Sequence, residues 1–326
     1  ANMRVSMHPG QYTVLNSNNP QVVERAILDL QYHTRVLNAL GLDTSHKIIL
    51  HIGGVYGDKD LAIQRFMKTY QGLDSAIRDR LVIENDDRSY TIEEVLAIGK
   101  YLGIPVVFDN LHHKINPSLE NLSDQDWIRK CKETWKPIDG VPKIHYSQQD
   151  IHKQKGAHSA TIYISEFMRF YETIQEENID IMLEVKDKNF STIKCINAIS
   201  KKNVMKNLEK EWSLYKYAVL EHSHKDYLEI RELLKDKKNP SVMNFYEIIE
   251  RSLAKEVSVS DGVNAALHIW GYFKNAATPR EKREFLKAID IYKVKGNNLV
   301  YIKNQLLKLA IAYEEGYISK SYYFYL

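Results

Sequence analysis

Six short apolar stretches of the sequence have the character of β-strands, and each ends in a residue that can bind a metal ion. The terminal residues are three histidines and three carboxylates: His8, His51, Glu84, Asp109, His145 and Glu184. The stretches cover residues 4–8, 47–51, 80–84, 105–109, 143–145 and 180–184. Strands that alternate with helices pair in parallel, and the carboxyl ends of barrel strands meet at one mouth. The sequence therefore predicts one pit that is lined by all six side chains.

The segments between the strands carry the start and stop signals of helices. Thr91-Ile92-Glu93-Glu94 has the form of a capping box, and Gly41 and Gly103 each end an apolar stripe of helical spacing. Helices are predicted at about 20–40, 58–70, 91–103, 123–134 and 161–177. An eight-fold barrel has two strand–helix units more than these six. We therefore predict an α/β fold, a TIM (β/α)8-type barrel that lacks about two N-terminal βα units in this chain and so has exposed edge strands.

The pattern changes after about residue 200. Residues 201–210 are polar and linker-like, and from Glu211 onward apolar residues recur at helical spacing without strand alternation. We therefore predict two domains, a barrel over residues 1–204 and an all-α domain over residues 205–326.

Composition limits the partners and the compartment. The net charge of +3 is too small to indicate a nucleic-acid partner by itself. The two cysteines, Cys131 and Cys195, provide neither a disulfide framework nor a thiolate zinc site, and they suit a reducing cytosol. No apolar run approaches the length that a membrane span requires. We expect a cytoplasmic protein without a membrane partner.

Eight side chains at or near the strand ends are potential metal ligands. His112 follows Asp109 by one short turn, and His158 follows His145 in a loop, so both join the six strand-end residues. One divalent ion such as zinc or manganese needs three or four ligands of this kind. Eight ligands predict two or three ions, with Glu84 or Asp109 bridging. Such a cluster suits phosphodiester hydrolysis, because one ion generates hydroxide while the others stabilise the attacking and leaving oxygens.

Lys143 precedes His145 by two residues, so both side chains face the same way on a strand. A lysine cation inside a barrel that holds metal ions would be costly. Three interpretations stay open at this point. The amine contacts a substrate phosphate, it is carboxylated and becomes an anionic ligand, or it reaches solvent at the start of the strand.

Six motifs, in this order, resemble those of the UV damage endonuclease family, which is related to endonuclease IV. They are His8-Pro9-Gly10-Gln11-Tyr12, His51-Ile52-Gly53-Gly54, Glu84-Asn85-Asp86-Asp87, Phe108-Asp109-Asn110-Leu111-His112-His113, Lys143-Ile144-His145-Tyr146-Ser147 and Leu183-Glu184-Val185-Lys186. The resemblance covers about residues 2–200. It implies a TIM barrel that nicks double-stranded DNA immediately 5′ of cyclobutane pyrimidine dimers and 6-4 photoproducts. It also implies two further N-terminal βα units that have no counterpart in this sequence.

The resemblance implies a role for each metal-binding residue. One ion would be held by His8, His51 and Glu84, a second by Glu84, Asp109, His145 and Glu184, and a third by His112, His158 and a carboxylated Lys143. Glu84, Lys143 and Glu184 are the implied catalytic residues. The implied ion is manganese, with zinc, magnesium and cobalt as alternatives. Gln11 and Tyr12 match the pair that the family inserts into the duplex at the lesion, where a poorly stacked step opens at lower cost.

Two other functions stay open. An abasic-site endonuclease of the endonuclease IV type is the nearer alternative, although the Gln11-Tyr12 pair and Lys143 argue against it. A metal-dependent sugar isomerase or epimerase on the same barrel would need no groove for DNA.

The C-terminal part has a resemblance of its own. Residues 212–216 and 268–274 resemble an uncharacterised helical domain that is also found in YbgA-like proteins, and this implies no function. The domain could bind DNA or another protein. A basic group in it could face DNA, but a solvated helix face is the preferred interpretation; the group is Lys274, Arg280, Lys282 and Arg283. We expect a monomer.

Overall fold

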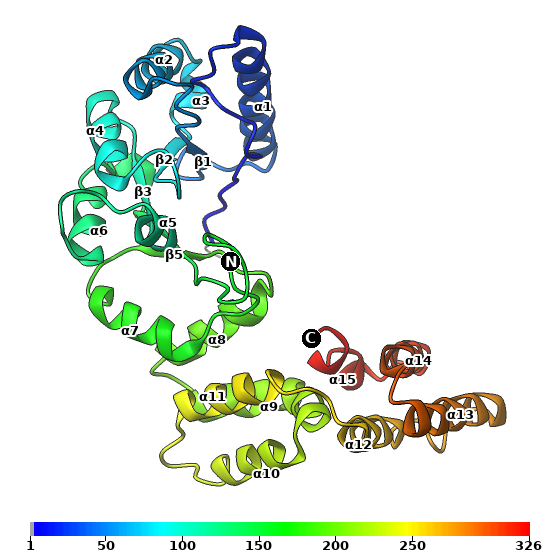
Figure 1. Ribbon diagram of the computed structural model, residues 1–326. Coiled ribbons are helices and arrows are strands. Elements are labelled where there is room, and N and C mark those ends of the chain that lie inside the picture. Colours follow the sequence, from blue (N-terminus) through cyan, green and yellow to red (C-terminus); the bar gives the residue numbers. More distant parts are fainter. Residues whose placement is uncertain (1–2) are drawn as a thin grey trace. The chain divides into compact units, whose positions relative to one another are not determined.

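The computed structural model describes residues 3–326, and its elements are shown in Figure 1. The contacts divide the chain into two compact units. The first comprises Ala1–Ile162 and Arg169–Ser191, and the second comprises Tyr163–Met168 and Thr192–Leu326. Among the described residues, none of the helices combines the length and the apolar character that crossing a bilayer requires.

A five-stranded parallel sheet forms the centre of the first unit, with the strands in sequence order. The strands are β1 (Ile48–His51), β2 (Leu81–Glu84), β3 (Val106–Asp109), β4 (Lys143–Tyr146) and β5 (Asp180–Leu183). Five of the six predicted strands are therefore present, and the parallel order is that of a TIM-type α/β fold.

Residues 4–8 were predicted to form the first strand, and this prediction is wrong. Met7 makes a single parallel bridge to Ile48: its N–H donates to the Lys47 carbonyl (3.0 Å), and its carbonyl accepts from the Ile49 N–H (2.9 Å). Its exposed neighbours Met3 and Val5 show that this segment lies at an open edge. Strand propensity is present there, but the backbone pairs at one residue on one side, which is too little for a ladder.

The two faces of the sheet have different neighbours, because successive side chains of a strand point to opposite sides. On the inner face, Ile49, Val82 and Val107 form a small buried cluster against Trp135. On the outer face, residues such as Leu50, Ile83 and Phe108 belong to the main core, which they share with the helices. The metal-binding residue at the end of β1, β2 and β3 is two positions beyond the inner cluster, and it therefore points inward.

Five helices begin and end close to the predicted positions: α1 (Pro20–Ala39), α2 (Lys59–Gln71), α4 (Ile92–Leu102), α6 (Asp124–Lys132) and α7 (Ile164–Ile174). The helices α3 (Ser75–Arg78), α5 (Asn110–Ile115), η1 (Pro137–Asp139) and α8 (Asn189–Ile199) were not predicted. Helices α7 and α8 each have residues in both units. The predicted capping box of α4 is present, with Thr91 and Glu94 bonded to each other's backbone N–H groups. Helix α4 packs on β2 and β3 (Figure 1). A side chain at Gly99 would overlap Val106, so glycine permits this close approach.

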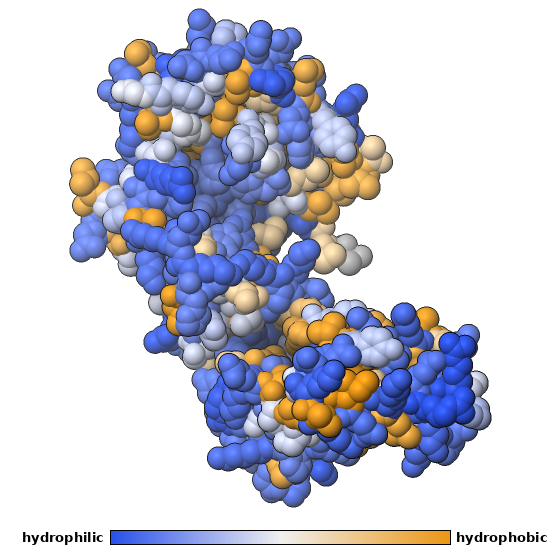
Figure 2. All heavy atoms as spheres, turned by 45° about the vertical axis from the view of Figure 1, so that its right-hand side comes forward, coloured by the Kyte–Doolittle hydropathy of each residue, from blue (hydrophilic) through white to orange (hydrophobic). Residues whose placement is uncertain are grey.

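The second unit is helical, as predicted. Its further elements are α9 (Val204–His222), α10 (His224–Leu233), α11 (Val242–Leu253), α12 (Val259–Trp270), α13 (Pro279–Lys295), α14 (Leu299–Ala312), α15 (Gly316–Ser319) and η2 (Tyr322–Phe324). Trp270 stacks on Phe285 in its core, with ring centroids 4.4 Å apart. Figure 2 shows mostly hydrophilic side chains on the visible surface of the first unit and more apolar ones on the second.

Candidate metal centre

The registers of the sheet bring the predicted ligands together in pairs. His51 lies directly across from Glu84, and Asp109 lies directly across from His145. Glu84 is paired with the residue two positions before Asp109, and His145 with the residue two positions before Glu184. Because a shift of two residues keeps side chains on one face, all five point to the same side of the sheet.

Glu84 is the centre of the site and is completely buried. Its Oε2 lies 3.3 Å from Nε2 of His8 and 3.8 Å from Nε2 of His51. One ligand atom from each of these three residues lies within 4.8 Å of the other two. Two imidazoles and a carboxylate at this separation form the first candidate metal site.

A second candidate site shares Glu84. One ligand atom each from Glu84, Asp109 and His145 again lies within 4.8 Å of the others, and all three residues are buried. Within residues 3–326, Oδ2 of Asp109 and Nε2 of His145 have no hydrogen-bond partner. A buried polar atom without a partner is costly. This donor set therefore fits a divalent cation, which would satisfy both atoms.

The ionisation of Glu84 and His145 is coupled through a short contact. Nδ1 of His145 lies 2.8 Å from Oε1 of Glu84 and 3.0 Å from Oε1 of Glu184. Burial by itself would raise the pKa of Glu84, but the charge of His145, with smaller effects of His51 and His8, holds it well below its usual range. Burial opposes the charged form of His145, but the two carboxylates raise its pKa to about 10. Glu84 and His145 thus form a buried ion pair.

The pKa of Asp109 is shifted in the opposite direction from that of Glu84. Burial raises the pKa of Asp109 to about 7, because the charge of His112 offsets only part of the desolvation. Its Oδ1 accepts a hydrogen bond from the backbone N–H of His112 (2.7 Å), where Asp109 caps α5. This contact fixes the carboxylate and leaves Oδ2 directed into the site.

The residues predicted to hold a third ion lie farther apart than the residues of the first two candidate sites. Nε2 of His158 lies 3.8 Å from Oε2 of Glu184, and the rings of His112 and His158 are 6.5 Å apart. Neither histidine belongs to the two tight clusters found among the described residues. Lys143 is buried rather than reaching solvent, and its amine donates to Oγ of Ser6 (2.6 Å). Burial lowers the pKa of Lys143 to about 8.

Two asparagines of the site have a function that the sequence analysis missed. The side chain of Asn85 accepts from the Asp109 N–H (2.9 Å) and donates to the Asp109 carbonyl (3.1 Å). Asn110 makes the same pair of bonds to the backbone of Ser147, at 2.8 and 3.0 Å. Each asparagine thus ties the end of one strand to the end of the next. The signal was an acid–Asn dipeptide at two consecutive strand ends, Glu84-Asn85 and Asp109-Asn110.

Asn85 also orients a histidine. Its carbonyl lies 3.0 Å from Nδ1 of His112, and an N–H there leaves Nε2 of the ring free for a ligand. The adjacent His113 has no part in the centre, because it packs between Phe108 and Trp127, with ring centroids 5.4 and 5.9 Å away.

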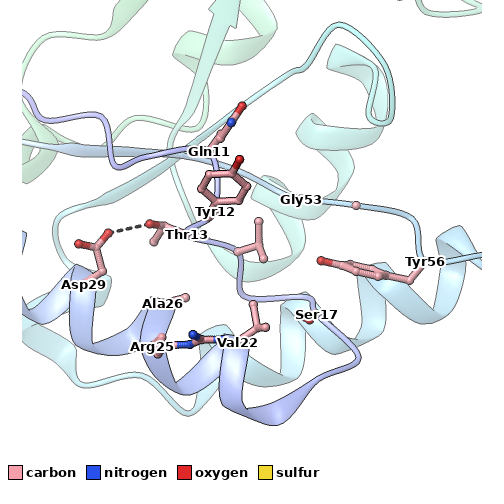
Figure 3. Close-up of a pocket in the computed structure, with 12 residues that line it drawn as sticks. Gln11, Tyr12, Thr13, Ser17, Val22, Arg25, Ala26, Asp29, Gly53 and Tyr56 are labelled. Carbon is pink, nitrogen blue, oxygen red and sulfur yellow. Dashed lines mark hydrogen bonds between the residues drawn. The ribbon is translucent and has the colours of Figure 1, made fainter.

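Gln11 and Tyr12 form the tip of a turn that follows His8 in the chain. The Thr13 N–H donates to the Gly10 carbonyl (2.9 Å), which makes residues 10–13 a β-turn. The hydroxyl of Thr13 donates to Oδ2 of Asp29 on α1 (2.6 Å), so the base of the turn is anchored (Figure 3). Tyr12 is 82% exposed. A fixed turn therefore presents a glutamine and a tyrosine to solvent beside the centre.

Comparison with known proteins gives two matches to family models. Residues 1–213 match the model described as UV-endonuclease UvdE, and residues 216–326 match a model described as a protein of unknown function (DUF1722).

Individual proteins give the same picture. A UV DNA damage endonuclease of Clostridium perfringens is 41% identical over 293 residues, which are 88% of this chain and 69% of that protein. One of Bacillus cereus (strain Q1) is 38% identical over 202 residues, covering 61% and 63%. The crystal structure of SacUVDE superposes with a TM-score of 0.56 at 40% identity, over 64% of this chain and 66% of that one. The chain thus spans about two thirds of the length of these relatives.

Proposed function

The chain belongs to the UV-endonuclease UvdE family, and we propose on that premise that it cuts double-stranded DNA immediately 5′ of UV lesions. Cyclobutane pyrimidine dimers and 6-4 photoproducts are the proposed substrates. The observation that carries the proposal is the pair of candidate metal sites that share Glu84 at the carboxyl ends of the strands. Both cysteines are free and buried, which suits a protein that acts in the reducing cytoplasm.

The different exposure of the residues of the site indicates the side from which a phosphodiester would approach. Glu84, Asp109 and His145 are at most 1% exposed and form a floor. The side chains of His8, His51, His158 and Glu184 are 24–37% exposed and form a rim. We infer that the ions lie between the floor and the rim and that the scissile phosphate approaches from the rim.

Each group of residues has a proposed task in the reaction. Divalent ions, proposed to be manganese, would supply an activated water and stabilise the attacking and leaving oxygens. Glu84 would orient both sites, since it lies within 3.8 Å of His8, His51 and His145. Glu184 holds His145 in place through Nδ1 at 3.0 Å. We propose that Lys143 is carboxylated and completes a third site with His112 and His158.

Positive charge on the loops after the strands supports a phosphate backbone as partner. Arg88 follows β2, and Lys153 and Lys155 follow β4. All three side chains are exposed; Arg88 is paired with Asp87 (3.6 Å) and Lys153 with Asp150 (3.0 Å), whereas Lys155 forms no ion pair among the described residues. Loops after the strands of such a barrel surround its mouth, and lysine or arginine there neutralises phosphates. We propose that these cations position the duplex for a monomeric enzyme while the Gln11–Tyr12 turn tests the stacking at the lesion.

The test is a nicking assay on three duplexes that differ at one position: a thymine dimer, an abasic site, and no lesion. We expect manganese-dependent cutting 5′ of the dimer and little cutting of the undamaged duplex. Cutting of the abasic duplex alone would identify the endonuclease IV type instead. Failure to bind any duplex at low salt would favour an isomerase or epimerase. A Glu84→Gln variant with full activity would contradict the proposed metal sites.

For the second unit, the proposal is that the basic side of α13 is solvated and does not contact DNA. Arg280 is already paired with Glu284 (2.8 Å), whereas Lys282 and Arg283 are exposed. A Lys282→Glu/Arg283→Glu variant should keep the wild-type dependence of DNA affinity on salt concentration. A slope smaller by about two would show that both cations contact phosphates.

A further inference from the structure

The sheet sets the position of several candidate ligands but not that of His158. Asp109 and His145 belong to paired strands, so the register places their side chains. His158 instead follows a loop, residues 150–157, in which the structure has neither helix nor strand. The imidazole nevertheless reaches the centre, where its Nε2 lies 3.8 Å from Oε2 of Glu184. Contacts within the loop must therefore direct this side chain.

One side chain, that of Gln149, connects the beginning of this loop to its end. The amide nitrogen donates to the carbonyls of Asp150, Gln154 and Ala157, at 2.8, 3.0 and 3.2 Å. The side-chain oxygen accepts from the Gly156 N–H (2.7 Å). An amide group has two donor hydrogens, so one of them is shared between two carbonyls. Four backbone groups of an irregular segment, which need partners like any others, thus find one in the same side chain.

The closed base of the loop leads directly to His158. Gln149 and His158 face each other as an isolated antiparallel bridge. Next to this bridge, the Ser159 N–H donates to the Gln148 carbonyl (2.8 Å). The residue that closes the loop and the residue that carries the imidazole are therefore direct neighbours across two short segments of backbone.

The chain after His158 is fixed by a different set of contacts. The Asp187 N–H, from the loop after β5, donates to the Ala160 carbonyl (3.1 Å). The buried hydroxyl of Ser159 donates to the Thr161 carbonyl (2.7 Å). None of these bonds involves Gln149. Loss of the Gln149 amide would therefore release the loop before His158 and leave the segment after it in place.

We propose that Gln149 is a positioning residue for His158: it closes the loop and so directs the imidazole to the third metal site. The inference rests on the proposed function, in which His112 and His158 hold that ion together with Lys143. Gln149 acts indirectly, because its side chain bonds backbone groups of the loop. Without the amide, the loop regains conformational freedom, and the imidazole leaves its place beside Glu184. Residues that orient a metal ligand in this way change metal affinity about 10- to 100-fold.

The first test needs no metal and measures hydrogen exchange of the backbone amides in the full chain by mass spectrometry. In Gln149→Ala, the amides of residues 150–157 should exchange roughly 10-fold faster than in wild type, because hydrogen bonds that oppose local opening are lost. Gln149→Glu has nearly the same shape and can still accept from the Gly156 N–H. Its ionised carboxylate has no hydrogen to donate, so exchange should be as fast as in Gln149→Ala.

Gln154→Ala is the matched control for both variants. Gln154 is an exposed glutamine of the same loop, and it contributes its backbone carbonyl to the contact with Gln149. Exchange in this variant should equal that of wild type. Wild-type exchange rates in both Gln149 variants overturn the inference.

The second test asks whether the effect reaches the metal centre through His158. In a calorimetric titration with manganese, Gln149→Ala should bind one ion about 10- to 100-fold more weakly and the other ions as wild type does. His158→Ala should weaken the same ion. The double variant should bind manganese as His158→Ala does, because a residue that acts only through another has no effect once that residue is gone.

Two results of the titration overturn the inference: equal weakening of all ions in Gln149→Ala, or weaker binding by the double variant than by His158→Ala. If wild type itself binds no third ion, the proposed function loses that site instead. The exchange rates, which are measured without metal, then decide the inference by themselves.

Discussion

Asn85 and Asp109 are joined by two hydrogen bonds, from the Asp109 N–H to the Asn85 side-chain oxygen (2.9 Å) and from the Asn85 amide to the Asp109 carbonyl (3.1 Å). Asn85 directly follows Glu84, and both residues are completely buried. The side chain of Asn85 therefore continues the pairing of β2 and β3 beyond the end of β2. This contact sets the separation of the two carboxylates in the second candidate site.

We predict that Asn85→Ala weakens manganese binding about 10- to 100-fold without unfolding the protein, as expected when a residue that orients metal ligands is lost. Calorimetric titration with manganese measures the change. Asn116→Ala is the control, since Asn116 makes one bond to the Asp86 carbonyl (3.1 Å) and belongs to neither metal cluster. An unchanged dissociation constant for Asn85→Ala would show that the ligands hold their positions without it.

The sharing of Glu84 predicts unequal metal losses in two variants. Glu84→Gln should lose two ions per chain, because both clusters contain this carboxylate, whereas His51→Ala should lose one. Elemental analysis after dialysis counts the ions, and unfolding curves confirm that each variant is folded. Equal losses in the two variants would mean that the clusters do not act as separate sites.

The two remaining interpretations of Lys143 predict opposite results for Lys143→Arg. If the amine is carboxylated, arginine cannot replace it, so one ion is lost and activity falls. If the amine contacts a substrate phosphate as a cation, arginine keeps most of the activity. We expect the first result. Carbon-13 NMR after incubation with labelled bicarbonate should show a carbamate signal in wild type that is absent from Lys143→Arg.

Glu211 predicts a pH dependence of stability in the second unit. Burial raises the pKa of Glu211 to about 7, although Tyr246 donates to its Oε2 at 3.5 Å. The folded state therefore binds a proton that the unfolded state releases above about 4.5. The associated stability is fully present below that pH and is lost progressively as the pH rises to about 7.

Glu211→Gln should remove this loss. At pH 8 we expect the variant to be more stable than wild type by roughly 3 kcal/mol, and near pH 4.5 the difference should vanish. Urea unfolding of the second unit at both pH values measures it. Glu209→Gln is the control, since Glu209 is exposed and paired with Lys237. A gain that is equal at both pH values would assign the effect to packing.

Local chemistry explains which parts of the fold were predictable. The capping box at Thr91 and Glu94 and the short apolar runs of the strands are properties of neighbouring residues, so five helices of the first 200 residues and five strand ends followed from the sequence. The segment at residues 4–8 was predicted wrongly because a strand also needs pairing, which here is limited to Met7. The turn anchored by Thr13 on Asp29 depends on a contact between separate elements.

The strand pattern by itself left open which carboxylate is shared, and only the family resemblance assigned it to Glu84. Glu84 and Asp109 both end strands, and either could have bridged two ions. The stagger of two residues between β2 and β3 favours Glu84, because it places this residue between the candidate ligands of β1 and those of β3 and β4. Register depends on how two strands pair, so it cannot be read from the sequence of either strand alone.

That stagger also restricts how the gene can change. Inserting or deleting one codon within β2 would turn Glu84 to the outer face and bring an apolar side chain into the metal centre. Single-codon changes in length are therefore excluded from the strands and confined to the loops between them. Those loops carry the turn at Tyr12 and the lysines after β4. The chain can thus alter what it recognises, one residue at a time, while its reaction centre stays fixed in length.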